Sequence, residues 1–170
     1  MEKDVEKGMN KSRFFIVTTV AWLVILMLDF MAHATILSSF WAKEYTALKS
    51  LRELFSLIPF HYLSLLALTI LIGWASVRIH GEGLNIVKGL FFGIIFGGLH
   101  SLTTFFGWYS VLNLPMDFIF LLSFFYFMEI LAVSVTYGYL YYPVTIRKRI
   151  LIVIGMVFLG FVAAIILQNL

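Results

Sequence analysis

The sequence predicts an all-α fold, a polytopic bundle of about five transmembrane helices with its N-terminus inside the cell and its C-terminus outside. Of the 170 residues, 62% are hydrophobic and only 12% are charged, a composition far from that of a water-soluble domain. The apolar residues fall into five runs, each long enough to cross a bilayer. We therefore expect residues 1–170 to form a single membrane-embedded bundle without a separate domain.

The five runs define the expected helices, and short segments define the turns between them. The runs are Phe14–Trp41, Leu57–Val77, Leu84–Trp108, Met116–Tyr142 and Ile150–Leu167. Since about 20 apolar residues cross the hydrocarbon core, each run predicts one helix, and the short connections predict antiparallel neighbours. The first run is too long for a signal-peptide core and no small-residue cleavage site closes it. We expect a retained first span behind a cytoplasmic polar tail, residues 1–13.

The loop at residues 43–56 has an amphipathic pattern of its own. Leu48, Leu51 and Leu54 fall at helical spacing, opposite a charged face. The pattern predicts a short helix that lies on the outer leaflet. An amphipathic extension of the second span is the alternative.

Lysine and arginine counts give the expected orientation, because these residues are enriched in cytoplasmic loops. Nine lie in the tail and in the loops on its side, against three on the other side. The nine are Lys3, Lys7, Lys11, Arg13, Arg78, Lys88, Arg147, Lys148 and Arg149, and the three are Lys43, Lys49 and Arg52. The asymmetry predicts an N-terminus inside and a location in a prokaryotic cytoplasmic membrane.

Composition also excludes several kinds of chemistry. The chain has no cysteine, which excludes disulfides, thiolate metal sites, iron–sulfur clusters and cysteine nucleophiles. The net charge of +3 does not indicate a nucleic-acid partner, because the basic residues lie at the ends of apolar runs, where they meet lipid headgroups. The expected partner is the lipid bilayer.

Gly89, Gly93 and Gly97 form a stripe at a spacing of four in the third run. Small residues at this spacing let a second helix approach closely. The stripe predicts helix packing, either with another helix of the same chain or with a second copy in a homo-oligomer or membrane complex.

Five ionisable side chains form the candidate site: Asp29, His33, His61, His100 and Glu129. A charged residue at the centre of a membrane helix costs roughly 2.5–3.5 kcal/mol, so a plain anchor helix is not expected to carry Asp29. On straight helices that rise 1.5 Å per residue, His33 and His100 lie level, about 12 Å below the outer aromatic boundary. Asp29 and Glu129 lie deeper, near the midplane, and His61 lies above them. His100 shares a face with Gly89 and Gly93, so we expect it to point into the protein.

These residues fit several functions, which the sequence leaves open. They can form a hydrogen-bonded polar core in a non-catalytic scaffold or complex subunit. They can bind an ion or protons and serve transport, which is the function we expect, because ionisable groups inside a membrane mark such pathways. They can also hold a metal, or a haem between two histidines, in a redox protein. No nucleophile motif accompanies the histidines and carboxylates, so an intramembrane hydrolase is disfavoured and the sequence favours a protein that is not an enzyme.

The segment Leu28-Asp29-Phe30-Met31-Ala32-His33 and the glycine stripe ending in His100 resemble uncharacterised prokaryotic families of four- to five-span integral membrane proteins. The resemblance covers the first four expected spans and implies no activity. The histidine layout differs from that of four-helix dihaem cytochromes. The sequence shows neither a Walker-type nucleotide loop nor a rhomboid- or zincin-type motif.

Overall fold

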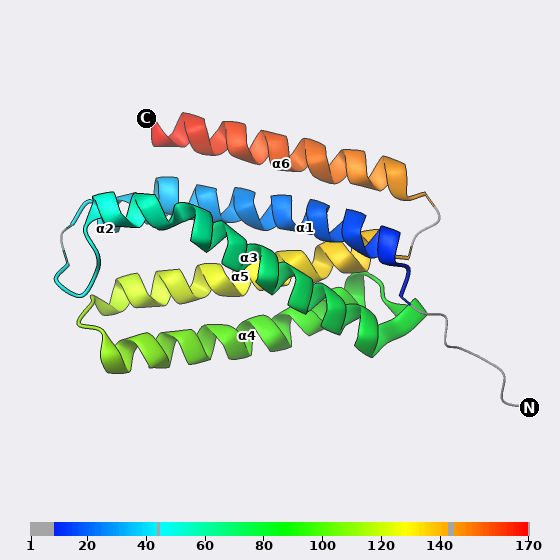
Figure 1. Cartoon of the computed structure of the whole chain (residues 1–170), viewed down its shortest axis with the longest axis horizontal. Helices are drawn as coiled ribbons and strands as arrows, with labels where there is room; N and C mark the ends of the chain where they lie inside the picture. The colour runs from blue at the N-terminus through cyan, green and yellow to red at the C-terminus, as the bar shows by residue number, and fades with distance from the viewer. Residues whose placement is uncertain (1–8, 44, 143–144, 170) are drawn as a thin grey trace, which may run out of the picture.

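A computed structural model describes residues 9–43, 45–142 and 145–169 of the chain, and these residues fold almost entirely into helices (Figure 1). Residues 1–8 of the predicted polar tail lie outside the described residues. The elements are α1 (Lys11–Met31), the π-helix η1 (Ala32–Ile36), α2 (Ser38–Trp41), α3 (Leu51–His80), the 3₁₀ turn η2 (Gly81–Gly83), α4 (Ile86–Val111), α5 (Met116–Leu140) and α6 (Ile146–Gln168).

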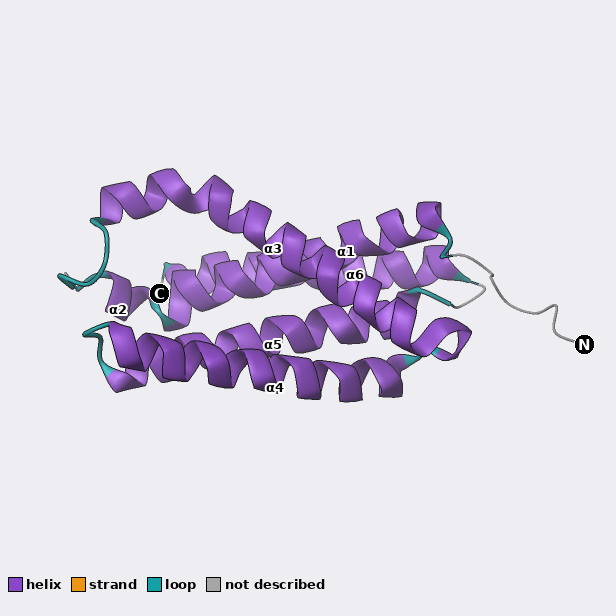
Figure 2. Ribbon diagram, turned by 60° about the horizontal axis from the view of Figure 1, so that its bottom comes forward, coloured by secondary structure: helices purple, strands orange, loops and turns teal. Residues whose placement is uncertain are grey.

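Five of the described helical segments are long and apolar enough to cross a membrane. This confirms the all-α class and the number of candidate spans. The segments are Lys11–Ile36, Arg52–Gly83, Ile86–Val111, Met116–Leu140 and Ile146–Gln168. Their lengths and order make an elongated bundle in which consecutive long helices run in opposite directions (Figures 1 and 2).

Helix α5 is the centre of the bundle, with α4, α1 and α3 packed around it. Helices α4 and α5 lie side by side along most of their lengths, and α3 crosses the bundle obliquely (Figure 2). Helix α6 packs mainly against α1 (Figure 1). The larger core cluster lies between α1, α3 and α5 and includes Ile25, Ile72 and Tyr137.

The amphipathic segment after the first loop belongs to the second span. Helix α3 runs without a break from Leu51 to His80, so it is the extension that the sequence offered as the alternative to a separate surface helix. Its start is fixed by a capping box, in which the Ser50 hydroxyl accepts from the Glu53 backbone and the Glu53 carboxylate accepts from the Ser50 backbone. Pro59 lies inside this helix and does not end it.

The first span is not the single straight helix that the sequence predicts over Phe14–Trp41. Helix α1 ends at Met31, and the backbone then widens into the π-helix η1, where the Leu37 N–H donates to the Ala32 carbonyl across five residues at 2.8 Å. A turn at Leu37 leads into α2. The prediction was wrong because uninterrupted hydrophobicity shows the length of a span but not a change of helix type within it.

The glycine stripe packs against α5 of the same chain. A Cβ atom at Gly89 would lie 2.5 Å from the backbone oxygen of Ser134, and one at Gly93 would lie 2.9 Å from the Cα of Leu131. At Gly97 a Cβ would lie 3.1 Å from the Phe127 side chain. The stripe therefore serves an intramolecular contact, and a contact between copies would have to use another face.

This close approach makes a first prediction, because a methyl group at Gly89 has no room. We expect Gly89→Ala to lower the free energy of unfolding by about 1–3 kcal/mol, since the α4 and α5 backbones would have to separate. SDS-induced unfolding of the purified protein measures the change. Gly98→Ala is the matched control: it lies on the same helix, and nothing stands within 4 Å of its Cβ position. Equal losses in both variants would show that the α4–α5 contact is looser than described.

Candidate functional site

Asp29 is the buried centre of the candidate site, with only 3% of its surface exposed. The Nε2 atom of His61, on α3, forms a hydrogen bond of 2.8 Å with Asp29 Oδ1. The Nε2 atom of His33, on η1, lies 3.3 Å from the same oxygen. Because an ionised carboxylate only accepts hydrogen bonds, both imidazoles direct an N–H toward it in that state. We call these three residues the Asp–His group.

Trp41 fixes the protonation of His33 from the other side of the ring. The Trp41 indole Nε1–H donates to His33 Nδ1 at 2.9 Å. An indole nitrogen is a donor only, so Nδ1 must be unprotonated, and the single ring proton lies on Nε2, facing Asp29. In this arrangement His33 is a neutral imidazole.

The break in the first span explains how Trp41 reaches His33. The two residues are eight positions apart, which is about 12 Å along a straight α-helix. The π-helix and the turn at Leu37 lie between the two residues, so the segment that joins them is not a straight α-helix. Single-turn π segments inside helices occur frequently at functional sites.

The Asp–His group opens into a cavity of about 580 Å³ between α1, η1, α2, α3, α4 and α5. The side chains of His33 and His61 are 29% and 34% exposed, while that of Asp29 is 4% exposed. The imidazoles thus connect a buried carboxylate with the cavity. The remaining walls are mostly apolar and aromatic, and Gln168 from the end of α6 also contributes.

His100 does not join the Asp–His group, and it is exposed on α4 where the sequence predicts a side chain that points into the protein. Its ring contacts Tyr126, with ring centroids 5.9 Å apart. A stripe with a spacing of four rotates about 40° around the helix at each step. The contact face therefore moves from Gly97 to Ser101, whose hydroxyl donates to the Ser123 carbonyl at 2.7 Å. His100 therefore lies at the edge of the contact face between α4 and α5.

Glu129 lies on α5 and is only 2% exposed. Its Oε2 atom has no hydrogen-bond partner among the described residues, and no described hydrogen bond connects it to the Asp–His group. Tyr126, one turn earlier, interacts electrostatically with both Glu129 and Asp29 and lines the cavity. The five predicted site residues are thus divided among the Asp–His group, a separate buried carboxyl at Glu129, and His100 on the surface of α4.

The Asp–His group also has the composition of a metal site. Each of its three residues offers one donor atom, and these atoms lie within 4.8 Å of one another. Two imidazoles and one carboxylate suit zinc, iron or manganese. A metal on His33 Nε2 would, however, move the ring proton to Nδ1, where it would face the Trp41 N–H. A haem iron between His33 and His61 would need the position that Asp29 occupies.

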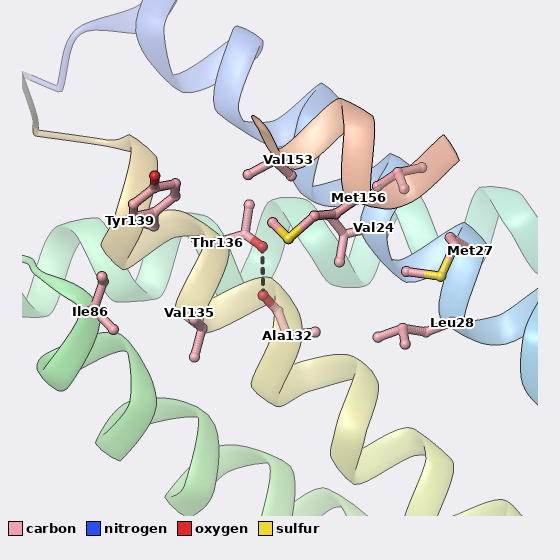
Figure 3. A pocket seen from close by; sticks show the side chains of 11 residues that line it. Val24, Met27, Leu28, Ile86, Ala132, Val135, Thr136, Tyr139, Val153 and Met156 are labelled. Atoms are coloured by element: carbon pink, nitrogen blue, oxygen red, sulfur yellow. Dashed lines mark hydrogen bonds between the residues drawn. The ribbon is translucent and has the colours of Figure 1, made fainter. Parts of the chain in front are cut away.

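A second cavity, of about 440 Å³, lies between α1, α5 and α6 (Figure 3). Figure 3 shows Met156 from α6 extending toward Thr136 of α5, and Met27 on α1. The hydroxyl of Thr136 is satisfied by the Ala132 carbonyl at 2.7 Å. The walls of this second cavity are almost wholly apolar, so the cavity offers hydrophobic contact but no group for chemistry.

Sequence reasoning missed Trp41 and the aromatic wall of the larger cavity, which includes Tyr62 and Trp108. Trp41 was interpreted only as a marker of the membrane boundary. No periodic signal identifies it, because its contact with His33 depends on the π-helix.

Comparisons with protein-family models, with curated proteins and with solved structures found no match for this chain.

Proposed function

We propose that this chain is a multi-pass membrane protein that binds protons at the Asp–His group and uses this binding in transport. The single observation that carries the proposal is a buried carboxylate that shares one oxygen between two imidazoles, both of which are partly exposed to a cavity. Ionisable groups at such positions in membrane helices mark proton and ion pathways.

The exposure of the histidines favours a working site over a polar contact that only holds helices together. A structural hydrogen-bond network is most stable when it is closed to solvent and fully satisfied. Here the two imidazoles face a cavity large enough for several water molecules. His61 can therefore pass protons between the cavity and the carboxylate, whereas the second ring nitrogen of His33 is already bonded to Trp41.

The charge distribution supports insertion in a cytoplasmic membrane with the N-terminus inside. Among the described residues, seven lysines and arginines lie at the end of the bundle where α1 begins: Lys11, Arg13, Arg78, Lys88, Arg147, Lys148 and Arg149. Three lie at the other end, namely Lys43, Lys49 and Arg52. By the positive-inside rule, the cavity then opens toward the outside.

Glu129 supports a route deeper into the bundle. A carboxyl group buried without a partner is costly when ionised, so it is held as a neutral acid or neutralised by a bound cation. Glu129 also interacts electrostatically with Asp29, which supports a role for it as a second carboxyl on the same route.

Metal binding is the second candidate function, because the three donor atoms of the Asp–His group converge. The Trp41 hydrogen bond to His33 opposes it. The two functions differ in what occupies the position beside Asp29, a proton or a metal ion.

Proton flux into liposomes tests the proposed function. The full chain is reconstituted with an enclosed pH-sensitive dye, and a potassium diffusion potential drives protons inward. We expect a flux that falls to the level of protein-free liposomes in Asp29→Asn, which keeps the shape of the side chain but can no longer bind or release a proton. Asp117→Asn, at an exposed carboxylate, is the control and should leave the flux unchanged. Full flux in Asp29→Asn would refute the proposal.

A further inference from the structure

We infer that the cavity beside the Asp–His group binds a lipophilic organic cation, with Asp29 as its counter-charge. The inference rests on the proposed function, because it names the molecule that would share the proton-binding carboxylate. Three observations support it: the aromatic side chains that line the cavity, the charge of the cavity wall, and the cavity volume.

The cavity walls are unusually aromatic. Six aromatic side chains line it: Phe30, Trp41, Phe55, Tyr62, Trp108 and Tyr126. They come from α1, α2, α3, α4 and α5, so they do not form a patch on one helix. Aromatic faces attract organic cations, by about 0.5–1 kcal/mol at exposed sites and about 2 kcal/mol when water is excluded. Apolar groups attached to the charge would contact the same rings.

The charge of the cavity has one sign. Asp29 is its only acidic residue among those described, and no lysine or arginine of the described residues lines it. The Trp41 hydrogen bond keeps His33 neutral. The described part of the cavity wall therefore combines one carboxylate with no permanently charged cation. A cation is therefore the complementary ligand.

The cavity also has a suitable size. Pockets for drug-sized molecules measure about 300–1,000 Å³ and combine apolar walls with a few polar groups. The volume here, about 580 Å³, lies within that range. A hydrated metal ion or a free proton would leave most of the aromatic wall without a role.

Proton and organic cation should compete, because each neutralises the same carboxylate. The titratable groups near Asp29 are His33 on η1, His61 and Tyr62 on α3, and Tyr126 and Glu129 on α5. The cavity-lining residues of α2, α4 and α6, namely Trp41, Trp108 and Gln168, add no titratable group. Acidification adds protons to this set and removes its negative charge, so cation binding should weaken as the pH falls.

Equilibrium dialysis with tetraphenylphosphonium and tetraphenylborate tests this inference on the detergent-solubilised full chain. The two probes have the same shape and opposite charges. Comparing them therefore distinguishes binding at a specific site from partition of the probe into the detergent, without any mutation. We expect saturable binding of one tetraphenylphosphonium per chain at alkaline pH, weaker binding at acid pH, and no saturable binding of tetraphenylborate. Equal binding of both probes would overturn the inference.

Variants add a second criterion. Asp29→Asn should weaken tetraphenylphosphonium binding by at least about tenfold, the effect of roughly 1.4 kcal/mol of lost charge pairing. Trp108→Leu should weaken it by a few fold. Asp117→Asn should not change it. Unchanged binding in Asp29→Asn would contradict the inference. If proton flux depends on Asp29 but tetraphenylphosphonium does not bind, this inference is refuted and the proposed function stands. If tetraphenylphosphonium binds, but there is no proton flux and the binding does not depend on pH, the proposed function is refuted.

Discussion

His61→Leu is expected to lower the free energy of unfolding by about 2–3 kcal/mol. The substitution removes the 2.8 Å hydrogen bond to Asp29 and leaves the carboxylate, 3% exposed, with the more distant His33 as its remaining partner. Hydrogen bonds to charged groups contribute about 1.5–3 kcal/mol, and an unsatisfied buried charge costs more. Unfolding of the purified protein by SDS, followed by helical circular dichroism, measures the loss.

His100→Leu is the matched control, because His100 is exposed and its ring nitrogens form no hydrogen bond to the described residues. We expect it to change the stability by no more than about 0.5 kcal/mol. A double-mutant cycle with Asp29→Asn then isolates the pair: the cost of His61→Leu should be much smaller once the carboxylate has been replaced. Equal costs for His61→Leu and His100→Leu would mean that His61 and Asp29 are not paired.

Trp41→Phe is expected to raise the affinity of the Asp–His group for Co²⁺ by about tenfold. In the wild-type protein, a metal on His33 Nε2 would place a proton on Nδ1 against the Trp41 N–H, so two donors would face each other. Leaving such donors unpaired costs about 1–3 kcal/mol, and 1.4 kcal/mol corresponds to tenfold in affinity. Phenylalanine keeps an aromatic ring and removes the N–H. Titration with Co²⁺, read by its visible absorption, measures the affinity.

Trp108→Phe makes the same chemical change in the same cavity, but no described hydrogen bond involves the Trp108 indole. Its Co²⁺ affinity should match that of the wild-type protein. If Trp41→Phe binds Co²⁺ no more tightly than Trp108→Phe does, Trp41 does not control the protonation of His33. Tight binding by the wild-type protein would favour metal binding over proton binding as the function.

The number and approximate positions of the spans could be predicted from the sequence, because hydrophobicity over about 20 residues is a property of the chain alone. The importance of Asp29 followed from the cost of a carboxylate in such a span. The packing of Gly89, Gly93 and Gly97 was also predicted in kind, and the structure supplies α5 as the partner helix.

The partners of Asp29 could not be predicted in full. His61 meets Asp29 because α3 crosses the bundle at an angle, and sequence gives no crossing angles. His100 was placed by assuming that α4 and α5 touch along one fixed face, whereas the contact rotates around α4 toward Ser101. Trp41 reaches His33 through a π-helix whose residues, Ala32–Ile36, continue the hydrophobic pattern of α1.

Infrared difference spectroscopy of the protonation of Asp29 tests the central claim most directly. Spectra of the full chain at neutral and acid pH are subtracted, and the difference is compared between the wild-type protein and Asp29→Asn. We predict that acidification produces a carbonyl band of a protonated carboxyl group that is missing in Asp29→Asn and retained in Glu129→Gln. Identical difference spectra for the wild-type protein and Asp29→Asn would show that Asp29 does not exchange protons, and would contradict the claim that the Asp–His group is a proton-binding site.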